Sequence, residues 1–312
     1  MFELKEEPLC KGIIFTKVLI KNQLEILFSN IGASIFEIKL ADKTGKMENI
    51  LITPSKKEWL DKRTFAGSIV GPLAGRYDVK HTNLEQNRFP IHFHGGSDGW
   101  DKKVWTQSCS NTQHKITITF RCTTENYSAN IIYSIDTECR ISMQIDVSPK
   151  TEMFINPTNH MYFNLNGSHF DPIKNHIFQL DAAYTYTEKN NLIQPNSLTK
   201  LTPELNFQNP RNLKTLYATH GINHTFKLNG PRKGLLEHPN NGRKIRFETS
   251  LPSVVIYTFN IAQEPFSRGD TLYPIYSGIT FETQYPANDL QLVTFSPQNP
   301  YHSVTTFQFY NR

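Results

Sequence analysis

The segment KITITFRCTTENYSANIIYSIDTECRISMQIDV, residues 115–147, decides the fold class. Apolar and polar residues alternate over residues 116–122 and again over residues 139–147, and a further apolar run lies between them at residues 129–135. This alternation places a row of apolar side chains on one face of a strand. The segment therefore predicts strands of a sheet with one buried face.

Similar short runs recur along the chain, separated by Asn, Gly, Pro and Ser, at residues 24–28, 35–40, 245–247, 254–261, 279–283 and 304–309. Helical periodicity is nearly absent, although residues 55–63 are compatible with two helical turns, with Ser55 as N-cap and Trp59 and Leu60 facing inward. Many strands without intervening helices predict antiparallel sheets, packed as a sandwich or closed as a barrel. Residues 164–235, rich in Asn, Pro and Thr, are expected to form long loops or irregular strands.

Composition narrows the classes of function. The 312 residues carry a net charge of +5 and scattered basic residues, which argues against a nucleic-acid partner. The first residues, MFELKEEPLC, contain no apolar stretch that would suit a signal peptide or membrane span, so we expect a cytoplasmic protein with reduced thiols and no membrane partner. One domain over residues 1–312 is the expectation, because large all-β folds often hold this length as one unit.

Two histidines stand two residues apart in FPIHFHGG, residues 89–96. On a strand, His92 and His94 would project to the same face, as metal ligands do in cupin-like barrels. A metal site needs more ligands, and only Asp98 stands close. The two glycines that follow favour instead a loop whose backbone approaches a ligand closely, and a histidine packed beside Trp100 is the structural alternative.

His160 lies among asparagines and aromatic residues in NPTNHMYFNLNG, residues 156–167. Sugar sites use such side chains, because hydroxyl groups need fixed donors and acceptors while the C–H faces of a sugar pack on flat apolar surfaces. By itself, the segment is equally compatible with a buried histidine in a structural turn.

Glu282 falls within an apolar strand run, in GITFETQYPAND, residues 278–289. Burying a carboxylate is unfavourable unless something uses it, so a buried Glu282 is a candidate general base. The alternation is also compatible with Phe281 inward and Glu282 in solvent, and periodicity does not decide between the two.

Arg76 follows a loop with three glycines and one proline, GSIVGPLAG, residues 67–75. Such a loop can aim a guanidinium at hydroxyl groups or at a phosphate, although the pattern of a phosphate-binding loop is missing. An arginine paired with a surface carboxylate is the alternative.

Taken in order, four segments resemble the aldose 1-epimerase (mutarotase) family: VGPLAGRY at 70–77, FHGG at 93–96, TNHMYFNLNG at 158–167 and FETQYP at 281–286. The third is the most specific. The resemblance implies an all-β fold with few short helices, a large antiparallel β-sandwich of the galactose mutarotase-like supersandwich type, with the sugar in an open cleft.

The resemblance also implies roles for single residues. Glu282 matches the general base and His160 the general acid, while His94 and Arg76 match ligands of the sugar. These residues would interconvert the α and β anomers of a hexose by opening and reclosing its ring, without a cofactor or a metal. The implied partner is a small-molecule sugar, and the protein is expected to be a monomer or a homodimer.

Departures from the family pattern leave the substrate open. In GINHTF, residues 221–226, Asn223 stands where the family carries a sugar-binding aspartate, and Val255 is apolar where a glutamine is common. A hexose-phosphate 1-epimerase is one alternative, which would need a second basic group such as Lys80 or Arg88 beside Arg76. A non-catalytic sugar-binding module of the same fold is the other.

Overall fold

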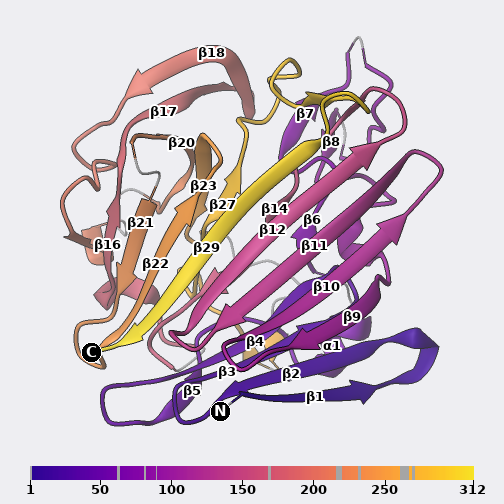
Figure 1. Ribbon diagram of the computed structural model, residues 1–312. Helices are drawn as coiled ribbons and strands as arrows, with labels where there is room; N and C mark the ends of the chain where they lie inside the picture. The colour runs from indigo at the N-terminus through magenta and orange to yellow at the C-terminus, as the bar shows by residue number, and fades with distance from the viewer. Residues whose placement is uncertain are drawn as a thin grey trace.

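The computed structural model describes residues 2–61, 64–80, 82–88, 90–167, 170–215, 220–230, 233–260, 267–268 and 271–312. Its largest sheet is built from β9 (Thr106–Asn111), β10 (Lys115–Thr123), β11 (Tyr127–Asp136), β12 (Arg140–Pro149), β16 (Ile177–Leu180), β19 (Arg211–Asn212), β21 (Lys233–Glu237), β22 (Arg243–Thr249) and β29 (Tyr301–Asn311). The order is β19-β16-β21-β22-β29-β12-β11-β10-β9, all antiparallel, and it runs across the whole molecule (Figure 1).

The predicted alternation sets the register of this sheet. Ile118 pairs with Tyr133, and Tyr133 pairs with Met143, so the apolar residues of three strands share one face. All three side chains are buried. The strand predicted at residues 304–309 belongs to β29, which lies in the middle of the sheet between β12 and β22.

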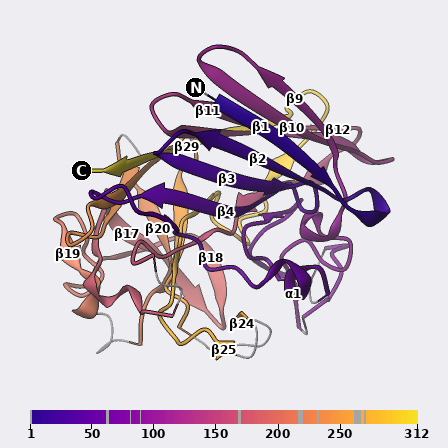
Figure 2. The ribbon, with the colours of Figure 1, turned by 90° about the horizontal axis from the view of Figure 1, so that it is seen from below.

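A second sheet covers one end of the first. It contains β1 (Phe2–Pro8), β2 (Ile14–Ile20), β3 (Leu24–Ser29), β4 (Ser34–Ala41) and β5 (Met47–Asn49), in sequence order. The Phe28 ring packs on Tyr133 with 5.2 Å between centroids, and the Tyr133 hydroxyl donates to the Ala33 carbonyl at 2.9 Å. Figure 2 shows β1 to β4 beside β9 to β12.

A third sheet has the order β18-β17-β20-β23-β27, with β17 (Ala182–Lys189), β18 (Leu192–Lys200), β20 (Asn223–Leu228), β23 (Ser253–Tyr257) and β27 (Glu282–Gln284). Phe281, directly before β27, packs on the large sheet, with its ring 5.0 Å from that of Phe247 and 5.9 Å from that of Phe178. Packed antiparallel sheets confirm the predicted all-β sandwich. The expectation of loops or irregular strands over residues 164–235 agrees with the structure, because the pairings of β17 with β18 and of β17 with β20 both contain a register shift.

Short strand pairs lie outside these three sheets: β6 (Ile69–Val70) with β14 (Thr158–Asn159), β7 (Arg76–Asp78) with β8 (Ile91–Phe93), β13 (Met153–Phe154) with β28 (Thr294–Phe295), β15 (Tyr162–Phe163) with β26 (Ile279–Thr280), and β24 (Ser267–Arg268) with β25 (Thr271–Leu272). The strand predicted at residues 279–283 is therefore split between β26 and β27. The strand predicted at residues 254–261 ends at Tyr257, and residue 261 lies outside the described residues.

The predicted helix is present as α1 (Lys56–Asp61). The Glu58 N–H donates to Ser55 Oγ at 3.3 Å and the Ser55 N–H to Glu58 Oε2 at 3.0 Å, a reciprocal cap of the helix start. Trp59 is fully buried. The described elements also include the 3-10 turns η1 (Cys10–Gly12), η2 (Trp100–Lys102) and η3 (Ile173–Asn175). In the described part of the chain no helix has the length and apolar character needed to span a bilayer.

A buried histidine pair next to η3 makes stability depend on pH. His176 is fully buried, and its Nε2 accepts the Leu165 N–H at 2.8 Å, so the proton of the neutral ring lies on Nδ1, near the Ile173 carbonyl. Burial, with His238 nearby, lowers the pKa of His176 to about 3. The unfolded chain takes up this proton near 6.5, so the stability from a neutral His176 is present above that pH and is lost as the pH falls.

We expect the free energy of unfolding of the wild type to fall by about 1.4 kcal/mol more per pH unit than that of His176→Gln between about pH 5.5 and 4. Urea unfolding at several pH values measures this slope. His114→Gln is the control, because His114 is exposed in the turn between β9 and β10 and its replacement should keep the wild-type slope. Equal slopes for the wild type and His176→Gln would contradict the prediction.

Candidate active site

His160 is held by the glycine-rich loop that precedes Arg76. Its N–H donates to the Ser68 carbonyl at 3.0 Å, and its carbonyl accepts the Gly67 N–H at 2.9 Å. Gly67 has φ +73°, and a Cβ there would lie 2.1 Å from the Ile35 carbonyl oxygen, so only glycine fits. This close approach of three segments leaves His160 5% exposed.

Glu282 lies where the chain changes its pairing partner. Thr280 pairs with Tyr162 on β15, whereas Glu282 pairs with Val255 on β23. Between them, the Phe281 carbonyl accepts a hydrogen bond from Asn159 Nδ2 at 3.0 Å while its ring points into the core. Glu282 is 4% exposed, so the alternative of a carboxylate in solvent is wrong.

The two residues meet. His160 Nε2 lies 3.5 Å from Glu282 Oε1, and the same oxygen accepts a hydrogen bond from Thr280 Oγ1 at 2.8 Å. His160 Nδ1 is buried and has no hydrogen-bond partner among the described residues. An imidazole nitrogen and a carboxylate oxygen therefore face each other, and these are two kinds of group that can transfer protons.

His94 lies next to the pair formed by His160 and Glu282. The Gly75 N–H donates to His94 Nδ1 at 3.1 Å, which places the proton of the neutral ring on Nε2. Burial lowers the pKa of His94 well below its ordinary value, and the nearby His160, Arg76 and Arg88 lower it further. His94 is thus a neutral hydrogen-bond donor, with its ring 5.5 Å from that of His160.

Two aromatic residues enclose His160: Tyr162, which belongs to the segment 156–167, and Phe65, which the sequence did not single out. The half-buried Phe65 stacks on His160 at 5.8 Å between centroids and meets the edge of His94 at 4.8 Å. The Tyr162 ring lies 5.0 Å from that of His160. Burial raises the pKa of Tyr162 well above its ordinary value, and the Glu282 carboxylate adds to this, so its phenol stays protonated. Strand periodicity gives no signal for Phe65.

Two arginines lie at the edge of the group. The guanidinium carbon of Arg76 lies 5.6 Å from the centre of the Phe93 ring, and that of Arg88 lies 4.7 Å from it. The Phe93 ring in turn lies 3.8 Å from that of His94. Burial raises the pKa of a second carboxyl group, Glu188, although Arg76 nearby lowers it in part.

Asn223 lies farther out, on the same sheet face. It pairs with Tyr257, and Tyr257 shares β23 with Val255, which pairs with Glu282. Directly paired residues point to one face, so Asn223 lies on the Glu282 side of this sheet. Its side chain is exposed, which places it at the rim and not among the buried residues.

The paired histidines do not form a strand motif. β8 ends at Phe93, and His94 has φ +48°, so the extended backbone that would align His92 with His94 is broken between them. His92 Nδ1 lies 2.8 Å from the Glu85 carbonyl oxygen, whereas His94 Nδ1 contacts Gly75. Within the described ranges no group of three or more His, Cys, Asp or Glu side chains is arranged to hold a metal ion.

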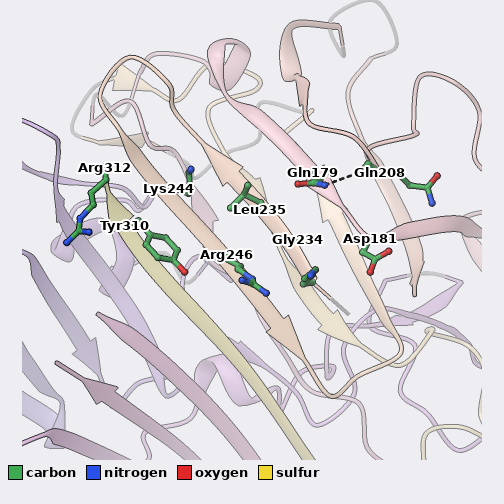
Figure 3. A pocket seen from close by; sticks show the side chains of 10 residues that line it. Gln179, Asp181, Gln208, Gly234, Leu235, Lys244, Arg246, Tyr310 and Arg312 are labelled. Carbon is green, nitrogen blue, oxygen red and sulfur yellow. Dashed lines mark hydrogen bonds between the residues drawn. The ribbon is translucent and has the colours of Figure 1, made fainter. Parts of the chain in front are cut away.

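A separate hollow of about 530 Å³ lies on the outer face of the large sheet, against β21, β22 and β29 (Figure 3). Lys244 Nζ lies 2.9 Å from Glu237 Oε2, and Arg246 pairs with Glu248, so these two cations are compensated. The described residues that line the hollow include none of those predicted to bind sugar.

Comparison with known proteins places the chain in a family. The aldose 1-epimerase family matches residues 16–308. Galactose mutarotase of Mus musculus is 26% identical over 331 aligned residues that cover 97% of this chain and 96% of that protein, and aldose 1-epimerase of Escherichia coli K12 is 22% identical over 89% and 90%. The crystal structure of galactose 1-epimerase from Lactobacillus acidophilus NCFM shares the fold, with a TM-score of 0.85 at 22% identity over 100% of this chain and 99% of that one. Because the family match spans nearly the whole chain, the protein belongs to the aldose 1-epimerase family of isomerases.

Proposed function

We propose that this protein interconverts the α and β anomers of a free hexose, with Glu282 as general base and His160 as general acid. The observation that carries the proposal is the 3.5 Å distance between His160 Nε2 and Glu282 Oε1. In a pyranose, the hydroxyl oxygen O1 and the ring oxygen O5 are both bonded to C1. An acid and a base that act on these two oxygens must therefore lie side by side, as this pair does.

In the forward step, the Glu282 carboxylate takes the proton of the O1 hydroxyl while protonated His160 gives its Nε2 proton to O5. The C1–O5 bond breaks, its electron pair stays on O5, and the C1=O1 double bond of the aldehyde forms. Rotation about C1–C2 exposes the other face of the aldehyde. Reclosure returns one proton from Glu282 to O1 and one from O5 to His160, so the enzyme is regenerated and no cofactor or metal is required.

The remaining residues would bind and orient the sugar. Neutral His94 has the Nε2 proton free to donate to a sugar oxygen, because its Nδ1 is occupied by the Gly75 N–H. Arg76 would contact hydroxyl groups from the edge of the group, and the exposed Asn223 would contact the sugar from the rim. Phe65 and Tyr162 supply flat apolar surface beside the acid.

One observation favours a phosphorylated hexose as a second candidate substrate. Arg76 and Arg88 flank the same Phe93 ring, so two cations converge near His94. A phosphate group needs such a convergence of basic groups. The carboxyl group of Glu188 near Arg76 weakens this candidate, since an ionised carboxylate there would oppose a phosphate.

Polarimetry tests the proposal. We expect the wild type to accelerate the change in optical rotation of freshly dissolved α-glucose or α-galactose in proportion to enzyme concentration. Faster relaxation on glucose 6-phosphate than on glucose would favour the phosphorylated substrate. A wild type that leaves the rotation of free and phosphorylated hexoses at the uncatalysed rate, while it still binds the sugar, would identify a non-catalytic sugar-binding module.

We also propose a cellular location, a domain organisation and a partner for the protein. We infer a cytoplasmic protein with one galactose mutarotase-like domain over residues 1–312, supported by one hydrophobic core shared by the three large sheets. A monomer or homodimer with a small-molecule sugar as its partner is the accompanying proposal. We do not propose a nucleic-acid partner, because the basic residues are scattered along the chain.

A further inference from the structure

We propose that Thr280 is a positioning residue that fixes the carboxylate of Glu282 through a hydrogen bond to Oε1. The inference rests on the proposed role of Glu282 as the base. Thr280 is fully buried, and it stands two residues before Glu282, at the end of β26. It is the last residue paired with β15 before the chain joins β23, so it sits at the junction that aims Glu282.

The direction of the Thr280 hydrogen bonds follows from its neighbours. The Tyr257 N–H can only donate, and it donates to Thr280 Oγ1 at 3.2 Å. Oγ1 is therefore an acceptor on that side, and its own proton is left for Glu282 Oε1 at 2.8 Å. A backbone group of β23 thus orients a hydroxyl group, and the hydroxyl group orients the base.

Two consequences follow for catalysis. Oε1 accepts the hydrogen bond of the Thr280 hydroxyl group and faces His160 Nε2. Oε2 is therefore the oxygen left to take the proton from the O1 hydroxyl. A hydrogen bond donated to a carboxylate also favours its charged form over its neutral form. Thr280 therefore orients the base and bonds to the form of it that accepts a proton, without contacting the sugar.

The test compares pH profiles of anomer interconversion for Thr280→Val and Thr280→Ser. Valine has nearly the shape of threonine but lacks the hydroxyl group, whereas serine keeps it. For Thr280→Val we expect kcat to fall about tenfold or more and the acidic limb of the profile to move about one pH unit higher, as the loss of a hydrogen bond to a charged group implies. KM should change less than twofold, and Thr280→Ser should restore the wild-type position of the limb.

Thr283→Val is the matched control. Thr283 is also a buried threonine of this segment, but its Oγ1 bonds with Thr305 Oγ1 at 2.8 Å and not with the carboxylate. Its replacement tests the general effect of losing a buried hydroxyl group and should leave the acidic limb in place. If Thr280→Val does not fold, Thr280→Ala and Thr280→Ser form a second pair that differs only in the hydroxyl group.

The outcomes separate this inference from the proposed function. A Thr280→Val or Thr280→Ala profile with its acidic limb at the wild-type position overturns the role of Thr280, provided that Glu282→Gln is inactive. A limb that moves equally in Thr280→Ser overturns it as well, because the hydroxyl group would then not be the cause. If the wild type has no activity, or Glu282→Gln matches it, the proposed function itself fails.

Discussion

Glu282→Gln is expected to lower kcat for anomer interconversion by a factor of about 10² to 10⁴, the usual contribution of a positioned general base. Glutamine keeps the size of glutamate and can still accept the Thr280 hydrogen bond, but its amide cannot take a proton from the O1 hydroxyl. The side chain is 4% exposed and lies between Thr280 and His160. Because glutamine fits the same buried space, the substitution should leave the fold intact.

Polarimetry on α-glucose with the two proteins at equal concentration measures this loss. Glu248→Gln is the control, since it removes a carboxylate from the exposed end of β22 and should retain the wild-type rate. Circular dichroism establishes that both variants are folded. An unchanged rate for Glu282→Gln would mean that another group is the base.

Arg243→Met is expected to reduce the free energy of unfolding by about 3 kcal/mol, near the lower end for breaking a buried ion pair. Arg243 is fully buried. Its Nε donates to the Leu40 carbonyl at 3.1 Å, and its two terminal nitrogens donate to the carbonyls of Lys46 at 2.9 Å and Leu165 at 3.3 Å and to Glu48 Oε2 at 2.9 Å. One side chain thus ties β22 to the β1–β5 sheet and to the segment after β15. Methionine fills the space but leaves these acceptors without their donor.

Urea unfolding at pH 7 gives the measurement, and Arg246→Met is the matched control. Arg246 lies three residues further along β22 on the outer face, where it pairs with the exposed Glu248. Exposed pairs contribute about 0 to 1 kcal/mol, so Arg246→Met should stay close to the wild type. Equal losses for the two variants would mean that the Arg243 hydrogen bonds do not stabilise the junction of the sheets.

Local patterns predicted much of the fold. The alternation in residues 115–147 predicted strands because the side chains of a strand point to opposite faces with period two, whatever the strand pairs with. Ser55 and Trp59 likewise predicted α1, since capping and the burial of one helix face operate within a few residues. The composition of residues 164–235 predicted irregular strands but not their pairing partners, because partner and register are not local properties of the sequence.

For the candidate site, too, the sequence and the tertiary structure determined different features. The sequence by itself determined which residues were candidates, because His160, His94 and Glu282 stand in segments whose chemistry suits a sugar. Only the tertiary structure decided that Glu282 is buried and faces His160, since this depends on the change of partner from β15 to β23 after Thr280. The positions of Phe65 and Thr280 next to His160 and Glu282 also became known only from the tertiary structure. The physical reason is that strand periodicity is a local property, whereas the distance between an acid and a base on different strands is set by which strands pair and in which register.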